Sequence, residues 1–439
     1  MTTSVMKPAN QRVEILDHVR GVAILAVFLF HCLQFPLGPV VNFSGAGMNI
    51  VLLPATFGWA GVAVFFVVSG FCIHLSFQRD GRDWRRFLIR RFFRIYPPYL
   101  LALLVLAFVF PTTRLDFSSA ASWFRLFTHV FLIQNYFGET GPQAINAVFW
   151  SIAVEVQLYL LYPLLMKLVS KFGWRRTLQG LLICEVLLRG LGCVLKSVTH
   201  SGVGPPWTWL PACPFTFWLS WSVGAALADA FLHSRRLPLA DSSLALWLLL
   251  AVGSSIVKPL STFSFMFFAL LSAAAISKLL RADRRRTRVP AALIEHLRST
   301  GIYSYSIYMW HYPLLGLVAW DFLPASVPPL LYYPIFVSTW VMIMPLGALW
   351  YRTVELPSIA AGKWFLRLSD AARRQDLPAK LDGLPKGAES HLRKGTRLPA
   401  AGPPEIVNAH LGDSEATTHH PGNDLGTHQR AGAAQLKLL

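Results

Sequence analysis

Arg20 and His31 are two ionisable residues in an otherwise apolar stretch, eleven positions apart. In an α-helix, eleven residues make close to three turns, so both side chains lie on one face, roughly 16 Å apart along the axis. Arg carries a permanent charge in a fork that suits phosphate, and His exchanges protons near neutral pH. The pair therefore predicts an anion anchor and a general base on one helix.

The composition of the chain indicates the environment in which these two residues lie. The chain has 439 residues, of which 54% are hydrophobic and 14% are charged. In soluble domains about a quarter of all residues are charged. Such domains cannot bury this much apolar surface in cores of normal size. The sequence therefore predicts an all-α polytopic membrane protein whose partner is the lipid bilayer.

Ten segments are apolar enough to cross the bilayer as helices. They are residues 15–34, 57–77, 95–112, 148–166, 178–195, 212–232, 243–258, 260–280, 302–320 and 330–353. The stretch 243–280 is divided because Lys258 and Pro259 interrupt it. Segment 125–138 has too short an apolar part to cross, and we expect an interfacial or re-entrant element there.

The distribution of Lys and Arg predicts the orientation. With the N-terminus in the cytoplasm and 125–138 on the outer side, the inner segments hold 21 Lys and Arg and the outer segments hold 4. Cytoplasmic loops accumulate these residues, so we expect about ten transmembrane helices with both termini in the cytoplasm. The net charge of +18 then requires no nucleic acid as a partner.

Two domains are expected. Residues 1–362 form the transmembrane domain, and residues 363–439, rich in charged residues, Pro and Gly, form a disordered cytoplasmic tail. No removable signal peptide is expected at the N-terminus. The five cysteines have no paired spacing, which predicts neither a disulfide framework nor a metal site.

Ionisable groups inside membrane spans are costly and are functional candidates by default. The spans contain few of them: Arg20, His31, Glu155, Glu185, Arg189, Asp229, His311, Arg352 and Glu355. The predicted orientation places Arg20 near the cytoplasmic boundary and His31 deeper, towards the outer leaflet. In the structural alternative, Arg20 extends to the inner interface and His31 is a hydrogen-bonded core group.

Six motifs, in order, resemble the bacterial membrane acyltransferase-3 family over about residues 12–360. The first is Arg20, ten positions, then His31. The others are Gly58–Val62 to Val68–Phe71, the basic Arg90–Tyr99, Phe149–Glu155 with Tyr159, Tyr303–Leu314, and Glu355–Pro357. Three positions depart from the family pattern: Ala63 and Val156, where acidic residues are frequent, and His18, where Gly is usual. The chain resembles the stand-alone form of the family.

The resemblance implies an O-acyltransferase of the bacterial inner membrane, multi-pass, without a metal. The enzyme would transfer an acyl group, commonly acetyl from acetyl-CoA, to a hydroxyl of a cell-envelope or secreted carbohydrate, a glycan or glycolipid. His31 would be the general base, with Arg20 as donor-side anchor and Glu155 as a third catalytic residue. The acceptor would contact Ser151, Tyr159, Trp150 and His311, and the acyl-CoA would contact Arg20, Arg90, Arg91 and Arg94.

Other interpretations stay open for several of these residues. Glu155 can instead be a buried partner of Arg20 or Arg352. An aromatic belt at the membrane interface is the first interpretation of His311. The Arg cluster from Arg79 to Arg94 is explained equally well by orientation of the chain in the membrane and by contact with anionic lipids. Ser69, beside Gly70, is expected to allow close helix packing, and Glu185, Arg189 and Asp229 are expected to form structural pairs.

Two other functions are weighed against the acyltransferase. The first is a transporter or flippase for glycans or lipids, with Arg20 and His31 as a proton-coupling pair. It would be favoured by broken helices in corresponding positions of two halves, a symmetry that the sequence does not show. The second is a non-catalytic scaffold, which gives no reason to place Arg and His three turns apart.

Overall fold

The computed structural model describes residues 13–37, 53–137, 145–198, 210–282, 290–323 and 329–381. This part of the chain is helical and contains no strand. The chain divides into two compact units, Met1–Ala372 and Arg373–Leu439. The first unit contains the sites described below and every described helix up to α14, whose last residues belong to the second unit.

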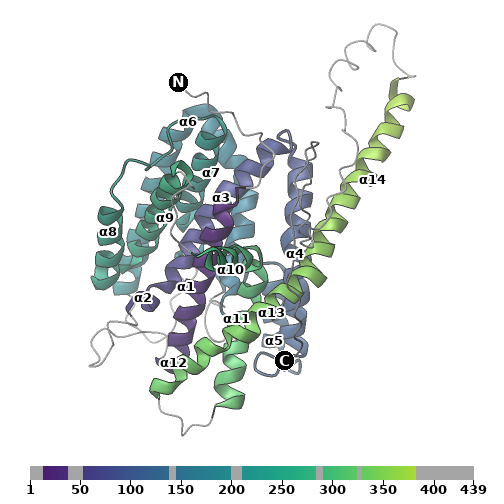
Figure 1. The fold of residues 1–439 in the computed structure, drawn as a ribbon. Helices are drawn as coiled ribbons and strands as arrows, with labels where there is room; N and C mark the ends of the chain where they lie inside the picture. Colours follow the sequence, from purple (N-terminus) through teal and green to yellow (C-terminus); the bar gives the residue numbers. More distant parts are fainter. Residues whose placement is uncertain are drawn as a thin grey trace, which may run out of the picture. The chain divides into compact units, whose positions relative to one another are not determined.

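The helices are all short or medium in length except α6 (Figure 1). Their bounds are α1 Ile15–Leu37, α2 Leu53–Thr56, α3 Gly61–Arg79, α4 Trp84–Phe108, α5 Ala120–Val130, α6 Phe149–Val198, α7 Trp218–Leu232, α8 Leu244–Ile256, α9 Ser264–Arg281, α10 Ala291–Ile302, α11 Ser304–Leu317, α12 Pro329–Ser338, α13 Trp340–Trp350 and α14 Leu356–Leu381. One-turn π-helical segments follow α11 and α13, at Val318–Phe322 and Tyr351–Glu355.

Within the described residues, six helical stretches are long and apolar enough to cross a membrane. They are Ile15–Gln34, Gly58–Arg79, Trp84–Phe108, Phe149–Leu195, Leu260–Arg281 and Tyr333–Ala371. Helices α7 and α8 are also apolar but shorter. The chain is an all-α, multi-pass membrane protein. Every one of the ten predicted segments overlaps helical residues, while the number of ten crossings and the orientation stay predictions.

Three details differ from the sequence-based expectations. The inner loop expected around residues 167–176 is reduced to a break at Gly173, whose φ of 74° and ψ of 164° are non-helical, so that α6 consists of two helical parts that meet there. Helix α10 lies partly in the expected loop that ends at residue 298. Helix α14 continues to Leu381, past residue 362, where the disordered tail was expected to begin; residues 382–439 lie outside the described residues.

The basic segment before residue 95 is also helical, because α4 begins eleven residues earlier than expected. The Asp83 carboxylate accepts from the backbone N–H groups of Arg85 and Arg86, at 2.9 and 3.2 Å. Such a cap satisfies amides that have no partner in the first turn. The cap therefore places the arginines that follow on a rigid helix instead of a loop.

The segment 125–138 falls on α5 and a short 3₁₀ turn, Gln134–Tyr136. Neither is among the candidate spans. The side-chain amide of Gln157, on α6, donates to the Leu132 carbonyl at 2.8 Å, and the Asn135 amide donates to the Ala212 carbonyl at 2.9 Å. These bonds hold the segment against the bundle without requiring it to cross.

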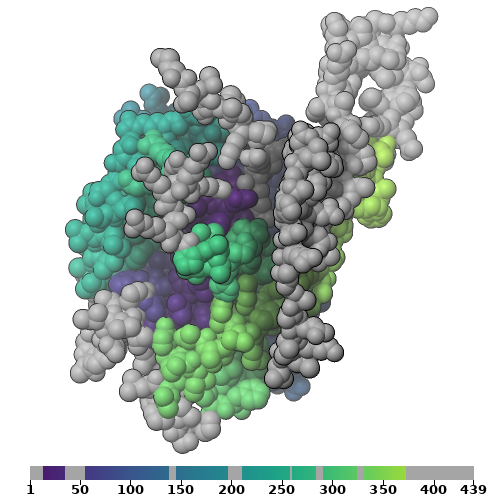
Figure 2. Space-filling view, in the orientation of Figure 1, coloured from purple at the N-terminus to yellow at the C-terminus, as the bar shows by residue number. Residues whose placement is uncertain are grey.

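Close helix contacts fix the position of α1. A Cβ on Gly21 of α1 would lie 2.1 Å from the carbonyl oxygen of Leu297 on α10. A Cβ on Gly301 of α10 would lie 1.7 Å from the carbonyl oxygen of Asp17 on α1. The two helices can approach this closely only because both positions are Gly. Figure 2 shows residues of α10 lying across those of α1 on the visible face. This contact holds the turn of α1 that carries Arg20.

Candidate active site

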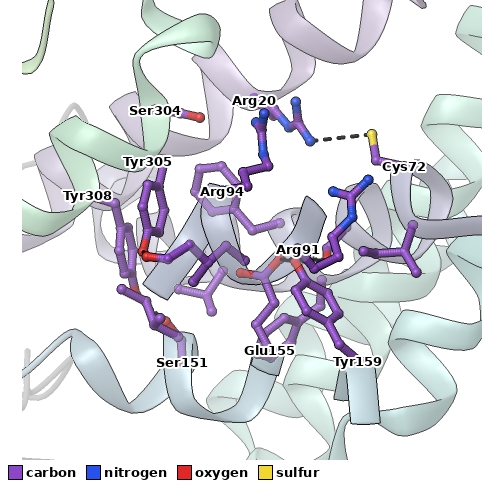
Figure 3. Close-up of a pocket in the computed structure, with 17 residues that line it drawn as sticks. Arg20, Cys72, Arg91, Arg94, Ser151, Glu155, Tyr159, Ser304, Tyr305 and Tyr308 are labelled. Carbon is purple, nitrogen blue, oxygen red and sulfur yellow. Dashed lines mark hydrogen bonds between the residues drawn. The ribbon is translucent and has the colours of Figure 1, made fainter. Parts of the chain in front are cut away.

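Helices α1, α3, α4, α6 and α11 surround a first cavity of about 90 Å³, the inner cavity (Figure 3). Its polar lining comes from Arg20, Ser69, Cys72, Arg91, Arg94, Ser151, Glu155, Tyr159, Ser304, Tyr305 and Tyr308. Apolar side chains of α3, α4 and α6 complete the wall. The lining combines apolar side chains with a few polar groups that converge on one space, the composition that binding sites typically have.

Three arginines give the inner cavity its charge. Arg20 donates to the Cys72 sulfur at 3.3 Å and lies 3.8 Å from the Asp17 carboxylate. Arg91 and Arg94, three residues apart on α4, share a face that lines the same space. The buried Nε of Arg91 has no hydrogen-bond partner among the described residues. Arg20 and Arg91 thus approach one space from two helices (Figure 3).

Hydroxyl groups hold the one carboxylate of the cavity, Glu155. The Ser69 hydroxyl donates to it at 2.6 Å, and the Tyr159 hydroxyl donates to the same oxygen. The Trp221 indole donates to Ser69 Oγ at 3.2 Å and orients that hydroxyl. With three cations and a single carboxylate that is already hydrogen-bonded, the cavity has an excess of positive charge. It is therefore suited to an anion with several negative groups.

The outer cavity is a second space, of about 230 Å³, at the other end of the same helix face. It is lined by Val27, Phe30, His31, Gln34, Trp59, Val62, Ala147, Val148, Trp150, Phe265, Tyr308 and Tyr312. This lining includes no charged Lys, Arg, Asp or Glu side chain. Among the lining side chains, the His31 imidazole has a ring nitrogen that can accept a proton.

His31 has a partner from a distant part of the sequence. Its Nδ1 lies 3.0 Å from Nε2 of His311 on α11, and the two rings are 5.0 Å apart. His311 is fully buried, and its own Nδ1 lies 3.1 Å from the Ile307 carbonyl oxygen. An interfacial aromatic belt therefore does not describe His311. The Tyr312 ring stands edge-on to His31 at 5.1 Å.

The two cavities meet at Val62 and Tyr308, which line both of them. The Tyr308 hydroxyl and Ser151 Oγ are 2.7 Å apart, and the tyrosine also donates to the Val148 carbonyl at 3.2 Å. These bonds fix the tyrosine at the junction. Arg20 and His31 therefore lie on opposite sides of one shared wall.

The structure brings most of the predicted site residues together. Arg20, Arg91, Arg94, Glu155, Tyr159 and Ser151 line the inner cavity, and His31 and Trp150 line the outer cavity. His311 contacts His31 from behind and lines neither cavity. Arg90 also lies apart from both, with its guanidinium 2.6 Å from the Asp80 carboxylate.

The alternative roles can now be compared with the structure. Glu155 is held by hydroxyl groups and interacts electrostatically with Arg20, one of its two suggested partners, while Arg352, the other, is exposed. Arg189 and Glu185 form the predicted structural pair, with Nη2 and Oε1 2.8 Å apart. Asp229 likewise pairs with Arg235, at 3.3 Å.

Sequence reasoning missed two residues of the site. Ser69 was expected to serve only in packing, a role that its neighbour Gly70 fulfils against the Trp221 carbonyl. Tyr308, at the junction, lies within the Tyr303–Leu314 motif but was not among the predicted site residues. Its position three residues before His311, and so on the same helix face, was the available signal.

The fold and the cavities define a class: a multi-pass, all-α membrane protein with an arginine-lined and a histidine-lined cavity in one bundle. The acyltransferase-3 family model, described as an acyltransferase domain, matches residues 13–350. The chain belongs to this family. The resemblance expected from the six motifs is thereby confirmed.

Individual relatives agree with the family. Acyltransferase MdmB of Streptomyces mycarofaciens is 32% identical over 173 residues, 39% of this chain and 43% of MdmB. Peptidoglycan O-acetyltransferase OatA of Listeria monocytogenes is 26% identical over 329 residues, 69% of this chain and 49% of OatA. Nodulation protein 10 of Rhizobium leguminosarum is 27% identical over 281 residues, 58% of this chain and 71% of that protein. The chain spans less than half the length of the first two relatives. No solved structure matches it.

Proposed function

We propose that this protein is an O-acyltransferase that moves an acyl group, acetyl in the simplest case, from acyl-CoA to a carbohydrate hydroxyl. The observation that carries the proposal is the shared wall at Val62 and Tyr308, with a cationic cavity on one side and a histidine-lined cavity on the other. Membership of the acyltransferase-3 family and relatives named as O-acetyltransferases support the reaction type.

The inner cavity would contact the phosphate groups of the donor. Acyl-CoA carries phosphate groups at one end and a thioester at the other. Arg20, Arg91 and Arg94 offer fork-shaped guanidinium groups, the side chains best suited to phosphate oxygens. Arg90 takes no part in this binding, since Asp80 engages it away from the cavity.

The outer cavity would hold the acceptor and perform the proton transfer. His31 takes the proton of the acceptor hydroxyl as its oxygen attacks the thioester carbon. The C–O bond forms, the C–S bond breaks, and the CoA thiolate leaves. The proton then passes from the imidazolium to the thiolate, so that the products are the acyl ester and CoA. Trp59 and Trp150 give the cavity aromatic faces of the kind that sugar rings contact.

The setting that we propose is the bacterial inner membrane, with ten crossings and both termini in the cytoplasm. Acyl-CoA would enter from the cytoplasmic side and the envelope or secreted carbohydrate from the outer side. The excess of Lys and Arg in the predicted inner segments supports this orientation. The relatives named for peptidoglycan O-acetylation support a glycan or glycolipid as acceptor.

The test uses the full chain purified in lipid nanodiscs with acetyl-CoA carrying a ¹³C-labelled acetyl group, together with glycans extracted from the host envelope. The expected result is mass-labelled ester on a carbohydrate hydroxyl, formed in step with free CoA. Cells with and without the protein should differ by the same ester. A proton-coupled transporter would move glycan across vesicles without consuming acetyl-CoA, and that outcome would overturn the proposal.

A further inference from the structure

We propose that His311 is a positioning residue, which holds His31 in the tautomer whose Nε2 lone pair is available to the outer cavity. This inference rests on the proposed function, in which His31 is the base. The starting observation is the 3.0 Å contact between His31 Nδ1 and His311 Nε2. A contact between two imidazoles does not by itself say which ring donates.

The partner of the second nitrogen of His311 decides the direction. His311 Nδ1 lies 3.1 Å from the Ile307 carbonyl oxygen, and a carbonyl oxygen only accepts. The proton of a neutral His311 is therefore on Nδ1. Its Nε2 carries a lone pair and must accept from His31. The His31 proton is thus on Nδ1, which leaves Nε2 of His31 without a proton.

The neutral form of His311 follows from its surroundings. The residue is fully buried, and an isolated charge in such a place is strongly unfavourable unless an opposite charge pairs with it. The outer-cavity lining beside the pair contains no Asp or Glu. The polar groups that face His311 are His31 and the backbone carbonyls of Ile307 and Tyr308. This environment favours two neutral rings joined by one hydrogen bond.

The arrangement also fixes the direction of the His31 ring. His311 contacts Nδ1, the Val27 backbone carbonyl one turn back also bonds to the ring, and the Tyr312 ring packs edge-on at 5.1 Å. The ring belongs to the lining of the outer cavity. When His31 takes a proton from the acceptor hydroxyl at Nε2, the charge spreads over the ring and strengthens the Nδ1–H bond to His311. His311 therefore acts through His31, as the buried carboxylate does in hydrolase triads, but without a negative charge.

Two substitutions separate this role from simple filling of space. In His311→Gln, the side-chain oxygen can occupy the position of Nε2 and accept from His31. In His311→Asn, the shorter amide reaches only the position of Nδ1 and leaves His31 without an acceptor. We expect kcat to fall by less than about 5-fold in His311→Gln and by about 100-fold in His311→Asn, the range in which general bases contribute. KM for acetyl-CoA should stay unchanged in both.

Equal loss in the two variants would overturn the inference. The tautomer itself can be read directly, by ¹⁵N solid-state NMR of the nanodisc-embedded protein with labelled histidine and with His31→Gln to assign the signals. The expected spectrum has a protonated Nδ1 and an unprotonated Nε2 at His31, and His311→Ala should shift it to a mixture of tautomers. A protonated Nε2 in the unsubstituted protein would refute the inference even if acyl transfer occurs. Failure of acyl transfer alone would refute the proposed function and leave the tautomer assignment intact.

Discussion

The inner and outer cavities share helices α1, α3, α6 and α11, yet their chemistry is opposite. The inner cavity, of about 90 Å³, contains three permanent cations, and the outer one, of about 230 Å³, contains no permanent charge and many aromatic rings. A permanent charge can hold an anion but cannot take part in proton transfer, whereas a neutral imidazole can. The difference indicates that the bundle separates donor binding from chemistry.

The two cavities also satisfy their polar groups differently. In the inner cavity Glu155 accepts from Ser69 and Tyr159 at one oxygen, while the Nε of Arg91 has no partner among the described residues. In the outer cavity the His31 ring contacts His311 through Nδ1 and also bonds to the Val27 carbonyl. Arg91 therefore offers a hydrogen-bond donor to a ligand in the first cavity, and His31 offers an acceptor in the second.

The largest expected effect comes from removing the base of the outer cavity. In His31→Gln we expect kcat for acyl transfer to fall by about 10²- to 10⁴-fold, because the acceptor hydroxyl loses the group that takes its proton. The affinity for CoA, measured by calorimetry in nanodiscs, should stay within about twofold, because the donor cavity is unchanged.

A matched control lies on the same helix. His18 bonds to the Glu14 carbonyl one turn back at 2.9 Å and lines neither cavity. His18→Gln should therefore retain transfer. If well-folded His31→Gln transfers acyl groups at the normal rate, the outer cavity has another base and the comparison fails.

The next effect, on the inner cavity, should appear in binding. Arg91→Met removes a buried guanidinium from the cavity and should raise the Kd for CoA by about 10-fold or more, since a charged hydrogen bond contributes about 1.5–3 kcal/mol. The control is its neighbour: Arg90 pairs with Asp80 outside the cavity, so Arg90→Met should change the Kd by less than about twofold. Equal effects of the two substitutions would show that general charge at the membrane surface, not the cavity, attracts CoA.

A third substitution tests the wall between the cavities. Val62 lines both cavities, so Val62→Phe should fill the junction between them and lower kcat by about 10-fold. CoA should still bind in the inner cavity. Leu160 on α6 is 66% exposed, and Leu160→Phe adds the same bulk away from both cavities. Normal transfer by Val62→Phe would mean that the acyl group passes by another route.

Local sequence patterns predicted the parts of this site that lie on one helix. The eleven-residue spacing placed Arg20 and His31 on one face, and the four-residue spacing placed Ser151 and Glu155 together on α6. Helix periodicity determines such relations before any tertiary contact forms. The predicted spans overlap helices for the same reason, because apolar runs of this length favour helix in a membrane.

Contacts between distant helices could not be predicted in the same way. His31 and His311 are 280 positions apart, and nothing in either local sequence specifies the other. Arg90 and Arg91 are adjacent arginines, which the sequence does not distinguish. In the structure Arg90 pairs with Asp80, whereas Arg91 lines the inner cavity. The early start of α4 depends on one capping residue, Asp83, which hydropathy does not register.

A smaller and local effect is expected at His129, on α5, outside both cavities and outside the candidate spans. Like His311, His129 is fully buried and places Nδ1 near a backbone carbonyl oxygen. Unlike His311 Nε2, which contacts His31, His129 Nε2 has no hydrogen-bond partner among the described residues. Burial lowers the pKa of His129 from 6.5 to about 4. The unfolded segment therefore binds a proton more readily than the folded one.

The sign of the resulting pH dependence follows from that difference. The full stability of the α5 segment is present above pH 6.5, and it is lost as pH falls from about 6.5 to about 4, by an amount on the order of 3 kcal/mol. Hydrogen exchange of the amides of residues 120–136 should accelerate over this range, relative to those of residues 149–165 on α6. His129→Gln does not titrate and should remove the pH dependence. An unchanged pH dependence in that variant would assign the effect to another group. The contrast between His129, whose Nε2 has no partner among the described residues, and His311, whose Nε2 contacts His31, would then have no effect on stability.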